Sequence, residues 1–147
     1  MYLVIRVNNM PELFHYTDEA GYRAITNRQN TLQTLVTVLS GRSPNDLLPG
    51  SGNAVHGPGV YFTDMSPRYQ RTTLSGAFFG GGNSRTGLPK TEYFIHYQFH
   101  GKTTGVNQPI SSKYPRVFLV PGDSIVRSNP TVIAHGKTDS YRSRYGG

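Results

Sequence analysis

The stretch that decides the fold is HGPGVYFTDMSP, residues 56–67. Its Gly-Pro-Gly segment (57–59) predicts a tight turn that lets the main chain come close to a ligand, because glycine has no Cβ. The Val-Tyr-Phe run that follows is β-prone. Ser66 and Pro67 then resemble a helix N-cap and first helical position. This order predicts a loop, a strand and a helix, with Tyr61 placed where the main chain approaches a ligand.

Length and composition limit the domain organisation and the chemistry that this chain can have. A chain of 147 residues predicts one domain, over residues 1–136, and the basic, core-poor residues 137–147 predict a flexible tail. The absence of cysteine excludes disulfides and thiol chemistry. The N-terminal apolar run is too short for a signal peptide, and no stretch is long enough to span a membrane.

Charge is the compositional outlier. Fifteen Lys and Arg against eight Asp and Glu give a net charge of +7. This excess indicates either an ordinary basic surface or an anionic partner such as nucleic acid, a nucleotide or an acidic protein. Because the basic residues are scattered, they form no localisation-type cluster.

The residue pattern predicts a strand-rich, loop-rich domain with short helices. We expect strands over residues 2–7, 13–17, 60–62, 92–100, 117–120, 123–127 and 131–135. We expect a helix capped by Asp18 and a second helix over 67–79, with Tyr69, Leu74 and Phe78 buried. Residues 32–39 have helical spacing but strand-like Thr and Val content, so both interpretations stay open.

Two motifs in fixed order carry a family resemblance. LFHYTD (13–18) is followed some forty residues later by GPGVYFTDMS (57–66). This pair resembles the ADP-ribosyltransferase superfamily, in particular its toxin-type group with a His–Tyr–Asp signature, and is similar to the diphtheria-toxin and poly-ADP-ribose polymerase branch. The resemblance implies an α+β fold: a split β-sandwich of two small sheets with a few short helices, clasping NAD between the sheets.

The resemblance implies that two signature residues, His15 and Tyr61, take part in catalysis and in NAD binding. His15 would hydrogen-bond a ribose hydroxyl with a neutral ring. Tyr61 would offer its face to the cationic nicotinamide ring, a cation–π contact worth about 0.5–2 kcal/mol. Tyr69 would cover the opposite face of that ring, or else belong to the core of the following helix.

The remaining implied site residues are main-chain contacts and a carboxylate. The main chain around Tyr16 and the hydroxyl of Thr17 would face the nicotinamide carboxamide, and Gly59 would allow close approach. The third signature residue is a carboxylate that stabilises positive charge on the ribose and accepts the acceptor's proton. Asp123, at the start of a late predicted strand, is the preferred candidate, and Glu92 is the alternative.

The implied function is a mono-ADP-ribosyltransferase toxin or effector domain that uses NAD. It would release nicotinamide and transfer ADP-ribose to a protein or nucleic acid, after delivery or secretion into a target-cell cytosol, with a cognate immunity protein as a partner. Two alternatives stay open: an NAD glycohydrolase toxin, and a non-catalytic module of the same fold that binds ADP-ribose or nucleic acid. RNA 2′-phosphotransferase shares the fold, but Tyr61 fits it poorly.

Other polar residues predict less. His96 and His100 share one strand face without further ligands at metal-binding spacing, so we expect no metal site. Four basic residues are expected near the cleft rim, where they would contact the pyrophosphate or an anionic acceptor, or form an ordinary solvated surface: Arg68, Arg71, Arg85 and Lys90.

Overall fold

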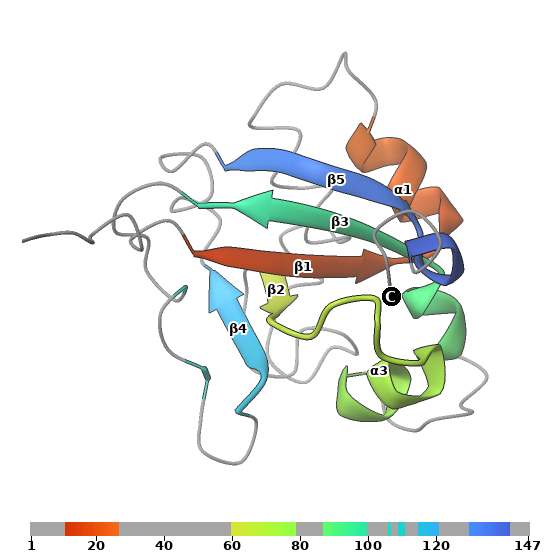
Figure 1. The fold of residues 1–147 in the computed structure, drawn as a ribbon, viewed down its shortest axis with the longest axis horizontal. Coiled ribbons are helices and arrows are strands. Elements are labelled where there is room, and N and C mark those ends of the chain that lie inside the picture. The colour runs from red at the N-terminus through yellow and green to blue at the C-terminus, as the bar shows by residue number, and fades with distance from the viewer. Residues whose placement is uncertain are drawn as a thin grey trace, which may run out of the picture.

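The computed structural model describes residues 11–26, 60–78, 87–99, 106, 109–110, 115–120 and 130–141. Within them, five strands form one antiparallel sheet in the order β4–β2–β1–β3–β5, accompanied by two α-helices (Figure 1). The α+β expectation is therefore confirmed at this coarse level. No described helix has the length and apolar character needed to cross a membrane.

The described elements are five strands, two α-helices and two 3₁₀ turns. The strands are β1 (Glu12–Thr17), β2 (Val60–Thr63), β3 (Tyr93–Gln98), β4 (Val117–Val120) and β5 (Thr131–Lys137). The helices are α1 (Glu19–Thr26) and α3 (Arg71–Phe78), with single 3₁₀ turns at η4 (Leu88–Thr91) and η5 (Thr138–Ser140).

The sheet consists of two groups of paired strands, β1–β3–β5 and β2–β4. We call these groups the two ladders, and they meet at a single residue pair. β1 pairs with β3 along its whole length, and β3 pairs with β5. β2 pairs with β4 over four residue pairs, but β1 and β2 share only Phe14↔Thr63. Figure 1 accordingly shows β4 crossing steeply relative to β1, β3 and β5. The strands that carry the two sequence motifs, β1 and β2, therefore lie at the junction between the ladders.

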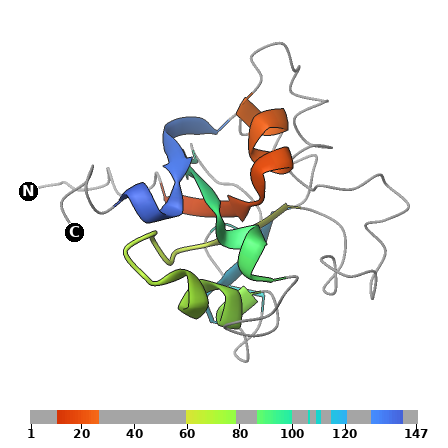
Figure 2. The same cartoon turned by 90° about the vertical axis from the view of Figure 1, so that its right-hand side faces the viewer.

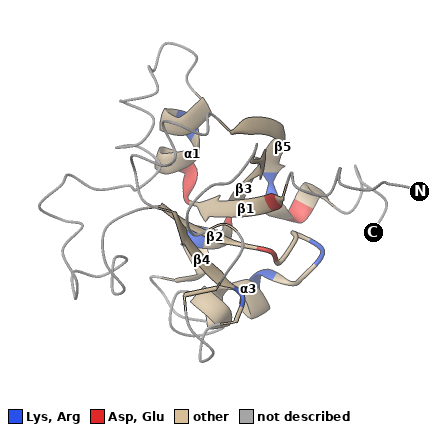
Figure 3. Ribbon diagram, turned by 90° about the vertical axis from the view of Figure 1, so that its left-hand side faces the viewer, with Lys and Arg blue, Asp and Glu red and all other residues tan. Residues whose placement is uncertain are grey.

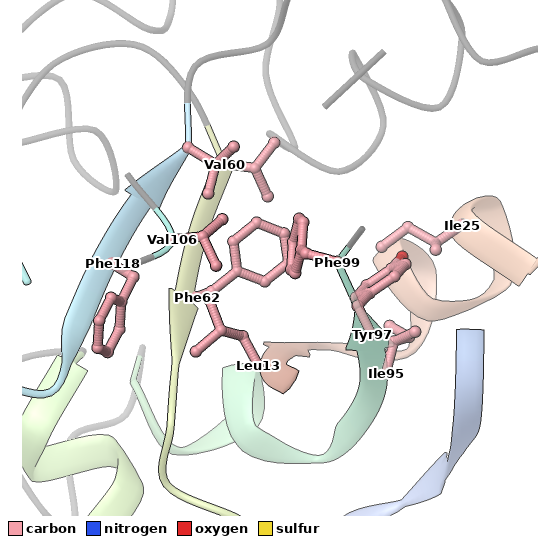
Figure 4. Packing of buried hydrophobic residues seen from close by; sticks show 10 residues of the cluster. Leu13, Ile25, Val60, Phe62, Ile95, Tyr97, Phe99, Val106 and Phe118 are labelled. Atoms are coloured by element: carbon pink, nitrogen blue, oxygen red, sulfur yellow. The ribbon is translucent and has the colours of Figure 1, made fainter. Parts of the chain in front are cut away.

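Strand alternation divides the buried side chains between the two faces of the sheet. One cluster surrounds Phe62, whose ring meets Tyr97 and Phe99 edge-on at 5.7 and 5.2 Å (Figure 4). The second cluster is centred on Phe14 and Phe94. α1 packs on the first cluster and α3 on the second, so the helices lie on opposite sides of the strands (Figure 2).

Most expected strands in the described ranges are confirmed. The strands expected over 13–17, 60–62, 92–100, 117–120 and 131–135 are β1 to β5, with ends shifted by one or two residues. Asp18 caps α1 as predicted, because its Oδ1 accepts the Gly21 N–H at 2.9 Å. The expected strands over 2–7 and 123–127, and the ambiguous residues 32–39, lie outside the described residues.

The helix expected from Pro67 begins later, at Arg71. Ser66 closes a turn instead: its carbonyl accepts the Tyr69 N–H at 3.1 Å and its Oγ accepts the Arg68 N–H at 3.3 Å. Leu74 is buried as predicted, but Tyr69 is 41% exposed. The prediction that Tyr69 is a core residue of this helix is therefore wrong.

The expectation of a flexible tail is wrong for residues 137–141. Lys137 is the last residue of β5, and Thr138 is buried with its Oγ1 donating to Thr91 O at 2.5 Å. The Tyr141 ring packs edge-on against Phe94 at 5.2 Å. These contacts make residues 137–141 part of the folded domain, whereas 142–147 lie outside the described residues.

Candidate functional site

His15 lies on β1 at the junction of the ladders and is bonded to β2. Its Nδ1 is 2.9 Å from the main-chain oxygen of Tyr61, a residue 46 positions later in the chain. Because a carbonyl oxygen only accepts, Nδ1 carries the proton and Nε2 presents a lone pair. Burial lowers the pKa of His15, and the bond to Tyr61 opposes this only in part, so the ring is neutral at pH 7.

Tyr61 is half-buried, and its main chain makes the contact with His15. Its neighbours Val60 and Phe62 point into the core cluster on one face of the sheet. Strand alternation therefore directs the Tyr61 ring towards the other side. The His15 ring stands edge-on to Phe62, with centroids 5.8 Å apart. The structure thus joins the two signature residues through the main chain of Tyr61, whereas strand alternation about the pair Phe14↔Thr63 directs the His15 ring to the Phe62 face and the Tyr61 ring to the Phe14 face.

Tyr16 has a structural side chain. Its ring belongs to the Phe14 cluster, and its hydroxyl donates to Met65 O at 2.7 Å. The side chain of Tyr16 is therefore unavailable to a cofactor, because strand alternation turns it to the face opposite His15. The expectation for its main chain is not affected by this contact.

Thr17 ends β1 against the first turn of α1. A Cβ at Gly21 would overlap Thr17 Oγ1, so the glycine makes room for this hydroxyl. Glycine weakens a helix relative to alanine, and this contact gives the physical reason for a glycine at position 21. The Thr17 hydroxyl packs against α1 here, and its expected contact with a carboxamide stays a prediction.

Tyr69 is held at the surface by an arginine that sequence reasoning missed. The Arg116 guanidinium lies over the Tyr69 ring, 5.7 Å from its centroid, and Arg116 Nε donates to Asp64 Oδ1 at 2.5 Å. Asp64 and Arg116 stand directly beyond the pair Thr63↔Val117, so the β2–β4 register brings them together. No local signal at Arg116 reveals this, because only the strand pairing places it beside the motif.

Of the two candidate carboxylates, Glu92 belongs to the described residues. Glu92 follows η4 and precedes β3, and its main-chain oxygen accepts the Thr138 N–H at 2.9 Å. Its neighbour Tyr93 pairs with Thr17, so Glu92 lies near the C-terminal end of β1. Asp123 and Gly59 lie outside the described residues.

Among the expected rim residues, Arg71 has a structural role. It donates to Thr91 Oγ1 at 3.1 Å and to Leu88 O at 3.0 Å, and it pairs with Asp139 at 3.4 Å. These bonds connect α3 to η4 and η5, so the Arg71 guanidinium makes contacts within the domain. Arg68, on the segment between β2 and α3 where Figure 3 shows basic residues, is exposed, whereas Arg85 lies outside the described residues.

No three metal-ligating side chains come together within the described ranges. His96 is instead packed against the Phe14 ring at 4.2 Å, with its Nε2 2.9 Å from Glu12 Oε1. Burial lowers the pKa of His96, although the Glu12 carboxylate opposes that shift. This ring is best explained as part of the sheet's packing.

Comparisons with protein-family models, with curated proteins and with solved structures found no match to this chain. The functional argument therefore depends on the motifs and on their geometry.

Proposed function

We propose that this chain is an NAD-dependent mono-ADP-ribosyltransferase of the toxin or effector type. The observation that carries the proposal is the bond between His15 Nδ1 and Tyr61 O at the junction of the two ladders. The two motif residues are far apart in the sequence, yet they meet at the point where β1 and β2 part. The two ladders joined by one residue pair also support the finer fold proposal of a split sandwich with NAD between two small sheets.

His15 has the protonation state that this role requires. Its donor is used by Tyr61 O, which leaves Nε2 as an acceptor for a ribose hydroxyl. Burial keeps the ring neutral, so a proton does not block this lone pair at pH 7. The bond also fixes the ring orientation before NAD binds, and a fixed orientation reduces the entropy cost of binding.

Aromatic rings would hold the nicotinamide group. The Tyr61 ring lies on the side of β2 away from the Phe62 core, and Tyr69 is 41% exposed on the turn that follows β2. The Arg116 guanidinium lies over one face of the Tyr69 ring, 5.7 Å from its centroid, so nicotinamide would use the other face. A nicotinamide cation is attracted by the same quadrupole.

A carboxylate would complete the reaction, and Asp123 is the preferred candidate over Glu92. The bond between nicotinamide and ribose breaks, and nicotinamide leaves with the bonding electron pair. The carboxylate stabilises the positive charge that develops on the ribose. The acceptor then bonds to the ribose carbon, and its proton passes to the carboxylate.

The proposed partners are those that the motif resemblance implies. NAD is the donor substrate, and the acceptor is a protein or a nucleic acid of the cell that the effector enters. A cognate immunity protein would protect the producing cell. If water takes the place of the acceptor, the same site is an NAD glycohydrolase, and without turnover the fold serves as an ADP-ribose or nucleic-acid binding module.

Labelled NAD separates these outcomes. Incubation of the protein with adenine-labelled NAD and a cell lysate is expected to move label into protein or nucleic acid. Label that stays as free ADP-ribose favours the glycohydrolase, and intact NAD favours the binding module. Asp123→Ala and Glu92→Ala are compared in parallel, and Asp123→Ala is expected to abolish transfer while Glu92→Ala retains it. Full transfer by Asp123→Ala would contradict the carboxylate assignment.

A further inference from the structure

β5 lies at one edge of the sheet. In the part of the chain that the structure describes, β5 pairs with β3 alone, and Figure 1 shows it as the outermost strand on that side. In an antiparallel ladder, every second residue points its N–H and C=O away from the partner strand. Beyond Thr131, where most β5 side chains are exposed, the outer edge of the strand can therefore offer main-chain donors and acceptors to an added strand.

The same strand carries the exposed apolar side chains of the described domain. Val132 and Ile133 are each 46% exposed, and Tyr69 is the one other large hydrophobic residue with comparable exposure among the described residues. The register passes from Tyr97↔Val132 to His96↔Ala134, so Ile133 is an extra, bulged residue. A bulge re-aims its side chain and limits long, regular edge pairing, which favours a short specific partner over aggregation.

Charge identifies the chemistry of that partner. β5 carries the exposed Lys137, and residues 130–138 contain no acidic side chain, whereas His135 Nδ1 is bonded to the Tyr22 hydroxyl at 2.6 Å. The whole chain has a net charge of +7, so an acidic segment is attracted while a second copy of this chain is repelled. A partner strand also needs apolar side chains to cover the exposed pair Val132 and Ile133.

We propose that the outer edge of β5 binds an extended acidic segment of a partner protein, which adds a strand beside β5. Main-chain hydrogen bonds would hold the added strand, apolar side chains would cover Val132 and Ile133, and acidic side chains would face Lys137. This surface is independent of the NAD site, so it stands whether or not the chain cleaves NAD.

The probe is a fluorescent peptide of about nine alternating Glu and Val residues, long enough to span the strand. We expect fluorescence anisotropy to show binding, and hydrogen exchange to slow at β5 amides. Methylation of alternate peptide nitrogens removes main-chain donors and is expected to weaken binding at least about tenfold. A peptide with Lys in place of Glu is expected not to bind.

A matched pair of variants locates the site. Ile133→Lys removes the apolar contact and is expected to weaken binding about tenfold, although its added positive charge alone would favour an acidic peptide. Thr73→Lys adds the same charge on the exposed side of α3 and is expected to bind as the wild type does. Circular dichroism checks that both variants are folded.

Three results of the binding experiments would overturn the proposal. They are no binding at about 1 mM peptide, equal binding by the methylated peptide, and equal binding by Ile133→Lys. Self-association that Ile133→Lys abolishes would also overturn it, because the occupant would then be a second copy.

Discussion

Tyr16 and Tyr97 are two buried tyrosines of the sheet that differ in hydrogen bonding. Tyr16 donates to Met65 O at 2.7 Å, whereas the Tyr97 hydroxyl has no hydrogen-bond partner among the described residues and points towards Ile25 of α1 (Figure 4). Burial raises the pKa of both hydroxyls, so both are protonated at neutral pH. Replacing each with phenylalanine therefore separates the hydrogen bond from burial of the ring.

The two substitutions should have different effects on the free energy of unfolding. Tyr16→Phe leaves the buried Met65 carbonyl without its donor, at a cost of about 1–3 kcal/mol. In a chain of this size, each kcal/mol corresponds to a shift in Tm of roughly 2–4 °C. Tyr97→Phe removes a buried hydroxyl that has no partner, so stability should stay within about 1 kcal/mol of the wild type or increase.

Urea unfolding followed by circular dichroism measures both differences, with equal slopes showing that the unfolded states are comparable. We expect the Tyr16→Phe midpoint to fall below that of Tyr97→Phe. Equal midpoints for the two variants would refute the reasoning. Tyr16→Phe should also leave KM for NAD unchanged, because the Tyr16 ring belongs to the Phe14 cluster and its hydroxyl is bonded to Met65 O.

Three further changes test other parts of the account. Gly21→Ala should lower the free energy of unfolding, because the new Cβ meets Thr17 Oγ1. This loss is expected despite a helix-propensity gain of about 1 kcal/mol. Thr17→Ala in the same chain should restore the stability, whereas a Gly21→Ala variant that is more stable in urea would show that the contact is absent. Arg116→Ala should change the free energy of unfolding by less than about 1 kcal/mol, because its ion pair with Asp64 is exposed. The same substitution should raise KM for NAD about two- to fivefold, because Tyr69 loses the cation that positions its ring. An unchanged KM in steady-state kinetics would count against that positioning role. Because burial lowers the pKa of His15 below 6.5, the unfolded chain takes up this proton first, and stability falls as pH drops below that value. The stability advantage of the wild type over His15→Asn should therefore shrink between pH 7.5 and 5 by at most about 1.4 kcal/mol per pH unit, and a constant difference in urea unfolding would contradict the shift.

Short-range patterns in the sequence predicted much of the sheet. The strand expected over 92–100 is β3, and the alternation of that strand places Ile95 and Phe94 in separate clusters. Asp18 was recognised as a cap because capping chemistry involves residues three positions apart. These features depend on residues that are two or three positions apart, so they can be predicted from the sequence alone.

Features that depend on strand register were not predictable. Asp64, a turn residue in the sequence, pairs with Arg116 because β2 and β4 align Thr63 with Val117. The start of α3 was misplaced because Ser66 closes a turn with Tyr69 in place of a helix. Both cases involve groups whose partners are chosen by tertiary packing and not by spacing along the chain.

The residues of the candidate site were predicted from the sequence, but their contact was not. The motifs named His15 and Tyr61, but their contact through Nδ1 and a carbonyl comes from the junction of the ladders. Strand alternation explains why Tyr16 is expected to contribute only its main chain, because its ring belongs to the Phe14 cluster.

The central claim is that His15 and Tyr61 form an NAD-cleaving site, and nicotinamide release by the purified protein tests it most directly. The account predicts release above the rate in buffer, with His15→Ala and Tyr61→Ala each reducing it by at least about 100-fold. His135→Ala is the matched control, because His135 stands opposite Ile95 in the same register row as His15 yet lies on the edge strand. Its release should equal that of the wild type. Release that is unaffected by His15→Ala, or no release by the wild type with or without lysate, would contradict the account.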